Sequence, residues 1–311
     1  MCKVAVVTTG FFDGVHLGHR HVLETVVSAA RERGEEATVV TFWPHPRTVL
    51  QQDARDLRLL TTLEEKKALL AAAGIDRVEV LPFTREFAAL TAEEYLRLLR
   101  ERFGATLVVM GYDNRIGSDG LSSDQLSVLC SGTKMPEFVR LEPKMTCSGT
   151  KMPEFVRLPA ISSTLIRKVL GEGGIEAAQA MLGYRYELYG VVVAGNRMGR
   201  TIGFPTANMQ LYEPLKLVPG NGVYAVEVEV LGATCKGMCN IGKRPTVGGT
   251  TRTIETHILD FDQDIYGLPM RLRFLRRIRD ERKFPSLEAL RAQLLEDREQ
   301  TLNVLCGQPT L

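Results

Sequence analysis

The sequence lacks the features that mark several large classes of protein. Its 311 residues carry a formal net charge of only +2, from 39 Lys and Arg against 37 Asp and Glu. A strongly basic footprint of the kind that nucleic-acid binders show is therefore missing. No stretch reaches the roughly 18 uninterrupted apolar residues that a membrane-spanning helix needs. We expect neither nucleic acid nor membrane as a partner, and any anionic ligand must be held by local groups.

Cysteines are few and scattered, with no CxxC pair and no clustered histidines that would complete a zinc site. We therefore expect reduced thiols and a cytoplasmic protein. The first ten residues, MCKVAVVTTG, have no small-residue cleavage site, so we expect a strand there and not a signal peptide. The six cysteines are Cys2, Cys130, Cys147, Cys235, Cys239 and Cys306.

Length and composition predict a two-domain globular protein. Hydrophobic residues make up 44% of the chain and charged residues 24%, which is enough apolar surface for real cores. At roughly 150 residues per domain, the length suggests two domains, and the pattern changes near Gly183. Residues 1–183 alternate short apolar runs with amphipathic segments, which predicts a parallel, doubly wound α/β sheet. Residues 184–311 show strands without intervening helices, which predicts a small β-barrel or sandwich.

The expected elements follow from periodicity and from turn residues. In the first domain we expect strands at Lys3–Thr9, Ala37–Phe42, Arg77–Leu81 and Thr106–Met110. Helices are expected at Leu17–Arg33, Thr62–Ala73 and Ala92–Phe103, with Thr62 and Thr91 as N-caps. In the second domain we expect a final helix from about Ser286 to Leu305, after strands at Tyr186–Val193, Gly222–Val230, Lys236–Ile241, Arg252–Phe261 and Met270–Ile278.

Twelve residues, CSGTKMPEFVRL, occur twice without change, at Cys130–Leu141 and Cys147–Leu158. One repetition cannot make a solenoid, which needs about three stacked units. Each copy could supply a short strand, EFVRL, but two identical strands would compete for one register. We interpret the duplication as an accident of cloning in preference to a designed element.

The segment GFFDGVHLGH, Gly10–His19, follows a predicted strand and opens a helix. Unpaired N–H groups and the helix dipole make such a terminus favourable for phosphate. Gly10 and Gly14 let the backbone approach closely, and His16 and His19 fall on one face. Two imidazoles directed at one anion suit transfer at phosphorus. His21 is expected to be an ordinary capping or surface residue.

A second glycine-rich segment, GVVVAGNRMGRTIGFPTAN, spans Gly190–Asn208. It is not a Walker loop, because GxxxxGK[ST] is absent. Pro205 stiffens a turn that would present the Thr206 hydroxyl and the Asn208 carbonyl oxygen, both acceptable ligands for Mg²⁺. Taken alone, such a segment is usually only a turn. The glycines and arginines that could wrap a polyphosphate are Gly195, Arg197, Gly199, Arg200 and Gly203.

A third segment, TIETHILDFDQDIYG, spans Thr253–Gly267. On a strand, Glu255 and His257 share one face, and Ile254, Thr256 and Ile258 share the other. A carboxylate on an ordered strand can accept the proton of an attacking hydroxyl. Periodicity alone favours a solvated edge residue at Glu255 and an orienting or structural role for His257. The arginines from 271 to 279 are most simply a solvated face.

Several motifs resemble those of one family. HLGH is the HxGH signature of the nucleotidyltransferase superfamily. Together with TFWPHP (Thr41–Pro46) and ISSTLIR (Ile161–Arg167), it resembles the N-terminal half of bacterial bifunctional riboflavin kinase/FAD synthetases. GRTIGFPTAN, GVYAVEV, NIGKRPTV and ETHILDFDQDIYG are similar to successive segments of the riboflavin kinase module. The resemblance implies a Rossmann-like domain over residues 1–183 and a six-stranded barrel with a terminal helix over residues 184–311.

The resemblance also implies roles for residues of the first domain. The hydroxyls of Ser162, Ser163 and Thr164 and the guanidinium of Arg167 would hold ATP phosphates. His16 and His19 would stabilise the transition state, and Arg167 the departing pyrophosphate. Gly111–Gly117 reads GYDNRIG where the family usually has GYDFRFG, so Asn114 and Ile116 replace two aromatic residues that could stack on a flavin. The nucleotide contacts expected in the first motif are Gly10, Phe12, Asp13 and Gly14.

In the second domain the resemblance implies that Thr206 and Asn208 bind Mg-ATP. Gly195, Arg200 and Gly203 would lie in the ATP loop, and Glu255 would be the general base toward the riboflavin 5′-hydroxyl. The expected enzyme is a transferase that phosphorylates riboflavin to FMN and adenylylates FMN to FAD.

The ligands expected from this resemblance are Mg²⁺, ATP, riboflavin and FMN, and the expected state is a monomer or weak homo-oligomer. Three alternatives stay open. One is an enzyme with only the kinase half active. Another is a nucleotidyltransferase for a different phosphorylated alcohol. The third is a flavin-binding regulator or store without turnover.

Overall fold

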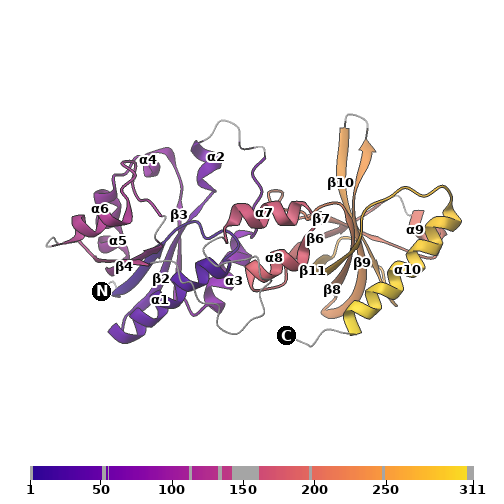
Figure 1. The fold of residues 1–311 in the computed structure, drawn as a ribbon, viewed down its shortest axis with the longest axis horizontal. Coiled ribbons are helices and arrows are strands. Elements are labelled where there is room, and N and C mark those ends of the chain that lie inside the picture. The colour runs from indigo at the N-terminus through magenta and orange to yellow at the C-terminus, as the bar shows by residue number, and fades with distance from the viewer. Residues whose placement is uncertain are drawn as a thin grey trace. The chain divides into compact units, whose positions relative to one another are not determined.

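The computed structural model describes residues 3–50, 54, 56–111, 114–131, 135–141, 161–195, 198–246 and 249–306. The chain divides into two compact units, residues 1–163 and 164–311 (Figure 1). Compactness alone does not assign function, so the boundary near Gly183 between functional domains stays a prediction.

The first unit is built on a parallel sheet in the order β3-β2-β1-β4-β5. Every neighbouring pair is parallel, which confirms the doubly wound prediction. This order begins at β1 in the middle and winds outward in both directions, so the carboxyl ends of β1 and β4 lie at the switch point, where such folds bind ligands. The strands are β1 (Ala5–Thr9), β2 (Glu36–Trp43), β3 (Arg77–Pro82), β4 (Ala105–Gly111) and β5 (Glu137–Leu141).

Helices cover both faces of this sheet. Side chains of α1 (Leu17–Arg33) and α3 (Leu63–Ala72) pack in the core on one face, and those of α5 (Ala92–Phe103) and α6 (Ser123–Cys130) pack on the other. Thr62 and Thr91 form capping boxes at the starts of α3 and α5, as predicted. Two short helices, α2 (Pro46–Leu50) and α4 (Arg85–Ala88), complete the unit.

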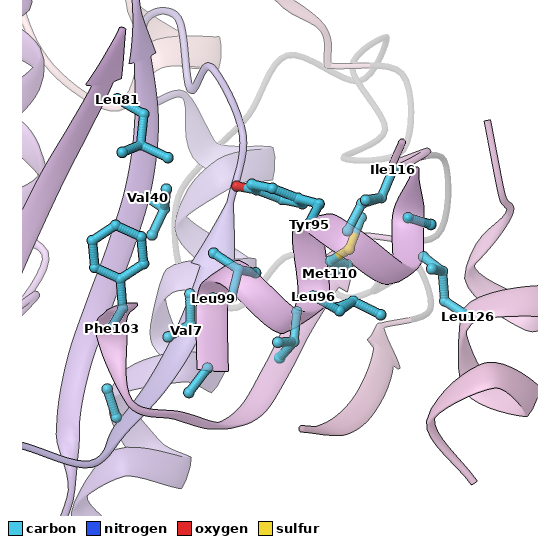
Figure 2. Packing of buried hydrophobic residues seen from close by; sticks show 14 residues of the cluster. Val7, Val40, Leu81, Tyr95, Leu96, Leu99, Phe103, Met110, Ile116 and Leu126 are labelled. Carbon is cyan, nitrogen blue, oxygen red and sulfur yellow. The ribbon is translucent and has the colours of Figure 1, made fainter. Parts of the chain in front are cut away.

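The core beneath α5 supports the end of β1. Figure 2 shows Leu96 and Leu99 of α5 packed toward strand residues such as Val7. Tyr95 lies in the same cluster, and its hydroxyl is hydrogen-bonded to the Thr9 hydroxyl at 2.6 Å. This bond ties the last residue of β1 to α5, so the loop that follows β1 starts from a fixed point.

The first copy of the duplicated segment supplies β5. Its residues Glu137–Leu141 pair in parallel with Leu107–Gly111 of β4. The second copy, residues 147–158, lies outside the described residues.

The second unit contains a closed barrel in the order β10-β7-β6-β11-β8-β9, with antiparallel neighbours throughout. The predicted six-stranded barrel is confirmed. The structure adds β7, a strand that periodicity did not predict. The strands are β6 (Glu187–Val193), β7 (Ala207–Leu211), β8 (Gly222–Val230), β9 (Ala233–Thr246), β10 (Gly249–Ile258) and β11 (Pro269–Arg279).

Four helices accompany the barrel: α7 (Ser163–Gly171), which starts at the division between the units, α8 (Ile175–Leu182), α9 (Met198–Thr201) and α10 (Leu287–Cys306). The last of them confirms the predicted terminal helix. Leu294 and Leu302 of α10 pack on a small core that includes Phe204 and Met238.

An ion pair inside the barrel unit anchors α10. The Asp297 carboxylate is fully buried and accepts hydrogen bonds from the Arg279 guanidinium of β11, with Nε–Oδ1 and Nη2–Oδ2 distances of 2.8 Å. Gln293 Nε2 donates a further bond at 2.8 Å. These donors satisfy a carboxylate that burial alone would strongly destabilise.

We expect Asp297→Ala to lower the free energy of unfolding of the barrel unit by about 3 kcal/mol, because removal of one partner leaves the other poorly compensated. Urea titration followed by far-UV circular dichroism measures this change. Glu296→Ala, one residue earlier on the exposed side of α10, is the control and should shift stability by less than about 0.5 kcal/mol. Equal effects of the two substitutions would contradict the anchoring role.

Candidate functional sites

The two motif histidines meet at the start of α1. His16 is the N-cap residue, and its Nδ1 accepts a hydrogen bond from the backbone N–H of His19 at 3.3 Å. The two imidazole rings stack with their centroids 3.6 Å apart and their planes 16° apart. The structure therefore brings together the pair that the sequence predicted.

His19 is held as a neutral imidazole. Desolvation lowers its pKa well below the ordinary value, and the charges of His16 and Lys66 lower that pKa further. Its Nδ1 is buried and has no hydrogen-bond partner within the described part of the chain. A polar atom left unpaired at a helix start is available to a ligand.

Asp13 fixes the loop between β1 and α1. Its buried carboxylate accepts hydrogen bonds from the backbone N–H groups of Leu60 at 3.0 Å and Thr61 at 3.1 Å. The Gly14 N–H in turn donates to the Thr61 hydroxyl at 3.1 Å. Gly14 has a φ of +82°, which a side chain would disfavour. The observed contacts of Asp13 are structural, and its predicted contact with nucleotide stays a prediction.

Phe12 and Ser163 complete the surroundings of this loop. The buried Phe12 ring packs edge-on against His19, with centroids 5.2 Å apart. The Ser163 hydroxyl donates to the Asp13 carbonyl oxygen at 2.9 Å, so this part of ISSTLIR reaches the loop. Ser162 is exposed. Thr164 and Arg167 belong to the second unit, and their roles stay predictions.

A cavity of about 370 Å³ opens beside this loop, at the ends of β1 and β4. Gly10 and Thr9 line it on the loop side. The Phe42 and Phe87 rings in its wall are neighbours, and their centroids lie 5.4 Å apart. Its aromatic lining consists of Phe11, Phe42, Phe83, Phe87 and Tyr95.

The aromatic wall of this cavity bears on the segment GYDNRIG, in which two aromatic residues of the family are replaced. Asn114 and Ile116 do line the cavity, but the aromatic surface comes from other segments. Ile116 is buried in the core beneath α5, where its side chain packs with apolar neighbours. A flat aromatic ligand therefore has ring surface available despite the two replacements. Tyr112 and Asp113 lie outside the described residues.

In the barrel, two cavities lie on opposite faces of β10. The alternation predicted from the sequence is present, because Ile254, Thr256 and Ile258 are buried while Glu255 and His257 are half-buried. Thr256 lines a cavity of about 610 Å³, and Glu255 lines one of about 320 Å³. Thr206 lines both, so the two cavities meet at this residue.

The larger cavity contains two of the residues predicted to bind ATP, Arg200 and Thr206. Its far wall is the segment 261–266, which contributes the carboxylates of Asp262 and Asp264. Two other residues that were predicted to bind ATP, Gly195 and Asn208, lie close to each other. A side chain at Gly195 would place Cβ 2.1 Å from Asn208 Nδ2, so it would displace the Asn208 amide from its present position.

Asn208 lies in a strand, which corrects the predicted turn. The turn ends at Thr206, and residues 207–211 form β7, because closure of the barrel requires their backbone groups to pair with β6 and β10. In this register Asn208 lies directly opposite Glu255. Gly203, with φ of +84°, makes the bend before Phe204.

The smaller cavity combines two carboxylates, those of Glu255 and Glu281, with apolar and cationic side chains. Glu255 Oε1 accepts a hydrogen bond from the Thr253 hydroxyl at 3.2 Å, which orients the carboxylate. Arg279 contributes positive charge, and Phe284 and Leu294 contribute apolar surface. Such a cavity suits an amphipathic ligand whose hydroxyl meets Glu255.

His257 orients the turn between the two cavities. Its Nδ1 lies 2.7 Å from the Pro205 carbonyl oxygen and so donates to it. Its ring packs edge-on against Phe204, with centroids 5.1 Å apart. Desolvation lowers the pKa of His257, which keeps the ring neutral. The side chain thereby holds Pro205, and with it Thr206, in place.

The arginines from 271 to 279 divide into two groups. Arg273 pairs with Glu229 at 2.6 Å and Arg276 with Glu176 at 2.9 Å, as expected of a solvated face. Arg279 is different, because it binds the buried Asp297 and also lines the smaller cavity. This role could not be read from the sequence, since the partner Asp297 is 18 residues away.

Within the described ranges, no group of three or more His, Cys, Asp and Glu side chains could hold a metal ion. In the same residues, no helix has the length and apolar character needed to cross a membrane.

Comparisons with known proteins identify a family for each part of the chain. The sequence matches the FAD synthetase family over residues 2–145 and the riboflavin kinase family over residues 182–305. It is 38% identical over 294 residues to the bifunctional riboflavin kinase/FMN adenylyltransferase of Escherichia coli K12, covering 94% of this chain and 90% of that one. The enzyme of the same name from Bacillus subtilis is 35% identical over 306 residues, with 96% and 92% covered.

A solved structure, named a macrolide-efflux protein from Streptococcus pneumoniae, matches with a TM-score of 0.87 and 34% identity, covering 97% of this chain and 95% of that one. The name of this structure differs from the names of the relatives, whereas both family matches agree with the names of the relatives. The chain belongs to the family of bifunctional riboflavin kinase/FMN adenylyltransferases.

Proposed function

We propose that this chain makes FAD from riboflavin in two steps, with the kinase step in the barrel and the adenylyl transfer in the parallel-sheet unit. The observation that carries the proposal is the presence of two separate sites of different chemistry. One has paired histidines at a helix start beside an aromatic cavity. The other has Glu255 facing one cavity and Thr206 joining it to a second.

In the kinase step, the larger barrel cavity takes ATP and the smaller takes riboflavin. The riboflavin 5′-hydroxyl oxygen forms a bond to the γ-phosphorus while the bond to ADP breaks. Glu255 accepts the hydroxyl proton as the new bond forms, since a carboxylate is too weak a base to ionise an alcohol beforehand. Arg200 supplies positive charge to the phosphates from the other side.

The donors in this site also suit Mg²⁺. The Thr206 hydroxyl and the Asn208 amide oxygen are hard, neutral ligands that can act together with substrate phosphates. When bound, the ion would neutralise phosphate charge. Asn208 is held in place by β7 and by the close backbone of Gly195. Asn208→Ala should therefore raise the Mg²⁺ concentration that half-saturates FMN formation.

In the adenylyl-transfer step, the flavin ring lies in the aromatic cavity and the FMN phosphate near the start of α1. A phosphate oxygen of FMN attacks the α-phosphorus of ATP, and the bond to pyrophosphate breaks. His16 and His19 stabilise the charge that develops on the transferred group. Ser162 and Ser163 contact the ATP phosphates. The phosphate contact of Thr164 and the pyrophosphate contact of Arg167 stay predictions from the ISSTLIR motif.

One incubation tests both steps. The purified chain is mixed with riboflavin and Mg-ATP, and the flavins are separated by chromatography over time. We expect FMN to appear first and FAD to follow with an equal release of pyrophosphate. FMN without FAD would support a kinase-only enzyme. A flavin that stays bound and unchanged would support a binding protein, and either result would overturn the two-step proposal.

The aromatic cavity favours FMN over other phosphorylated alcohols as the acceptor, because a ring system gains most from that wall. The cytoplasmic location and the monomeric or weakly oligomeric state remain predictions.

A further inference from the structure

Lys66 is a buried cation that the mechanism above does not use. Its side chain on α3 is fully buried, and its ammonium has no hydrogen-bond partner among the described residues. Lysines are almost never fully buried unless they are paired, because loss of hydration penalises the charge. A group kept in this state calls for a functional explanation.

The ammonium is directed at the first site. Nζ lies 3.5 Å from the centroid of the Phe11 ring, which forms part of the aromatic cavity wall. Its charge is close enough to lower the pKa of His19. Phe11 therefore separates the ammonium from the cavity, and the paired histidines follow this loop at the start of α1.

Rigid contacts fix Lys66 relative to that loop. The capping box of Thr62 and Glu65 sets the first turn of α3, and the Lys66 N–H donates to the Thr62 carbonyl at 3.0 Å. Just before α3, Leu60 and Thr61 donate to Asp13. Asp13 attracts the ammonium, but these backbone donors already satisfy its carboxylate. The Asp13 carboxylate thus has hydrogen-bond donors other than Lys66.

We propose that Lys66 is a positioning residue for adenylyl transfer: its ammonium, fixed behind Phe11, supplies positive charge that stabilises the phosphates of FMN and ATP beside His16 and His19. This inference rests on the proposed function of the first unit. The charge acts strongly here because the Lys66 side chain itself is shielded from water, and a preorganised cation needs no rearrangement during the reaction.

Stability distinguishes this role from a structural one. Desolvation lowers the pKa of Lys66 to about 8, so between that value and the ordinary value of about 10.4 the unfolded chain binds more protons. The stability of the first unit should therefore rise with pH over this range. The titratable groups that interact electrostatically with the ammonium are Asp13 from the loop and His19 at the start of α1. His16 stacks on His19, and His45 contacts the same Phe11 ring as the ammonium.

Lys66→Met keeps the volume of the side chain and removes the charge. We expect kcat/KM for FMN adenylylation to fall at least about tenfold, with riboflavin phosphorylation unchanged. The unfolding temperature should stay the same or rise, and its increase between pH 8 and 10 should disappear. Lys67→Met is the matched control, because Lys67 lies next on α3 and pairs with Glu64 at the surface.

Three results would overturn the inference. FAD formation by Lys66→Met within twofold of wild type would show that the charge is unnecessary. A drop in unfolding temperature beyond that of Lys67→Met would assign Lys66 a structural role. Equal loss of adenylylation in both variants would assign the effect to the surface of α3. By contrast, a wild-type chain that makes no FAD from FMN overturns the proposed function itself.

Discussion

Glu255→Gln should leave riboflavin unphosphorylated while FMN supplied to the same variant still becomes FAD. The amide has nearly the same shape and can still accept the hydrogen bond from Thr253, but it cannot take up the hydroxyl proton. Loss of a general base costs typically about 10²–10⁴-fold in rate. We therefore expect kcat for FMN formation to fall by about that factor, with little change in the KM for ATP.

The two half-reactions are measured separately, one with riboflavin and one with FMN as the flavin added. FAD formation from FMN serves as an internal test of folding for the first unit. Glu296→Gln, on the exposed side of α10, is the matched control for the loss of one carboxylate in the barrel unit. A Glu255→Gln chain that phosphorylates riboflavin at more than a tenth of the wild-type rate would remove Glu255 from the base role.

Elements with strong periodicity and clear end signals were predictable from the sequence. The helix over Leu17–Arg33 and the strand over Gly222–Val230 have the bounds that were expected. Thr62 and Thr91 form the expected caps, because a hydroxyl followed three residues later by Glu specifies a helix start locally. The same holds for His16 and His19, whose rings stack because the N-cap His16 accepts a hydrogen bond from the His19 N–H.

The features that the sequence did not reveal depend on closure of the barrel and on contacts between residues that lie far apart in the chain. The strand β7 is short and partly polar, and only the closed barrel gives its backbone partners. The aromatic cavity draws its rings from separate segments, where each looks like an ordinary core residue. Lys66 stands in the run EEKK, which is typical of a solvated helix, and only the packing of α3 against Phe11 buries it.

His16→Asn should stop the pathway at FMN. Asparagine is among the best N-cap residues, so it can replace the hydrogen bond that His16 Nδ1 accepts from the His19 N–H and keep the start of α1 intact. What it lacks is the imidazole that stacks on His19 and that we propose stabilises the transferred group. Loss of one preorganised stabilising group costs about 10²–10³-fold in kcat, and we expect FAD formation to fall by that factor.

The control is His21→Asn, the same substitution two residues after His19 on the same helix. The Thr25 hydroxyl donates to the backbone carbonyl oxygen of His21, which this substitution keeps. Riboflavin phosphorylation reports that the barrel is unaffected in both variants, and far-UV circular dichroism reports that α1 is kept. If His21→Asn loses as much FAD formation as His16→Asn, the effect belongs to the helix and not to the imidazole. If neither loses it, adenylyl transfer takes place without the paired rings, and the start of α1 is not where the phosphates react.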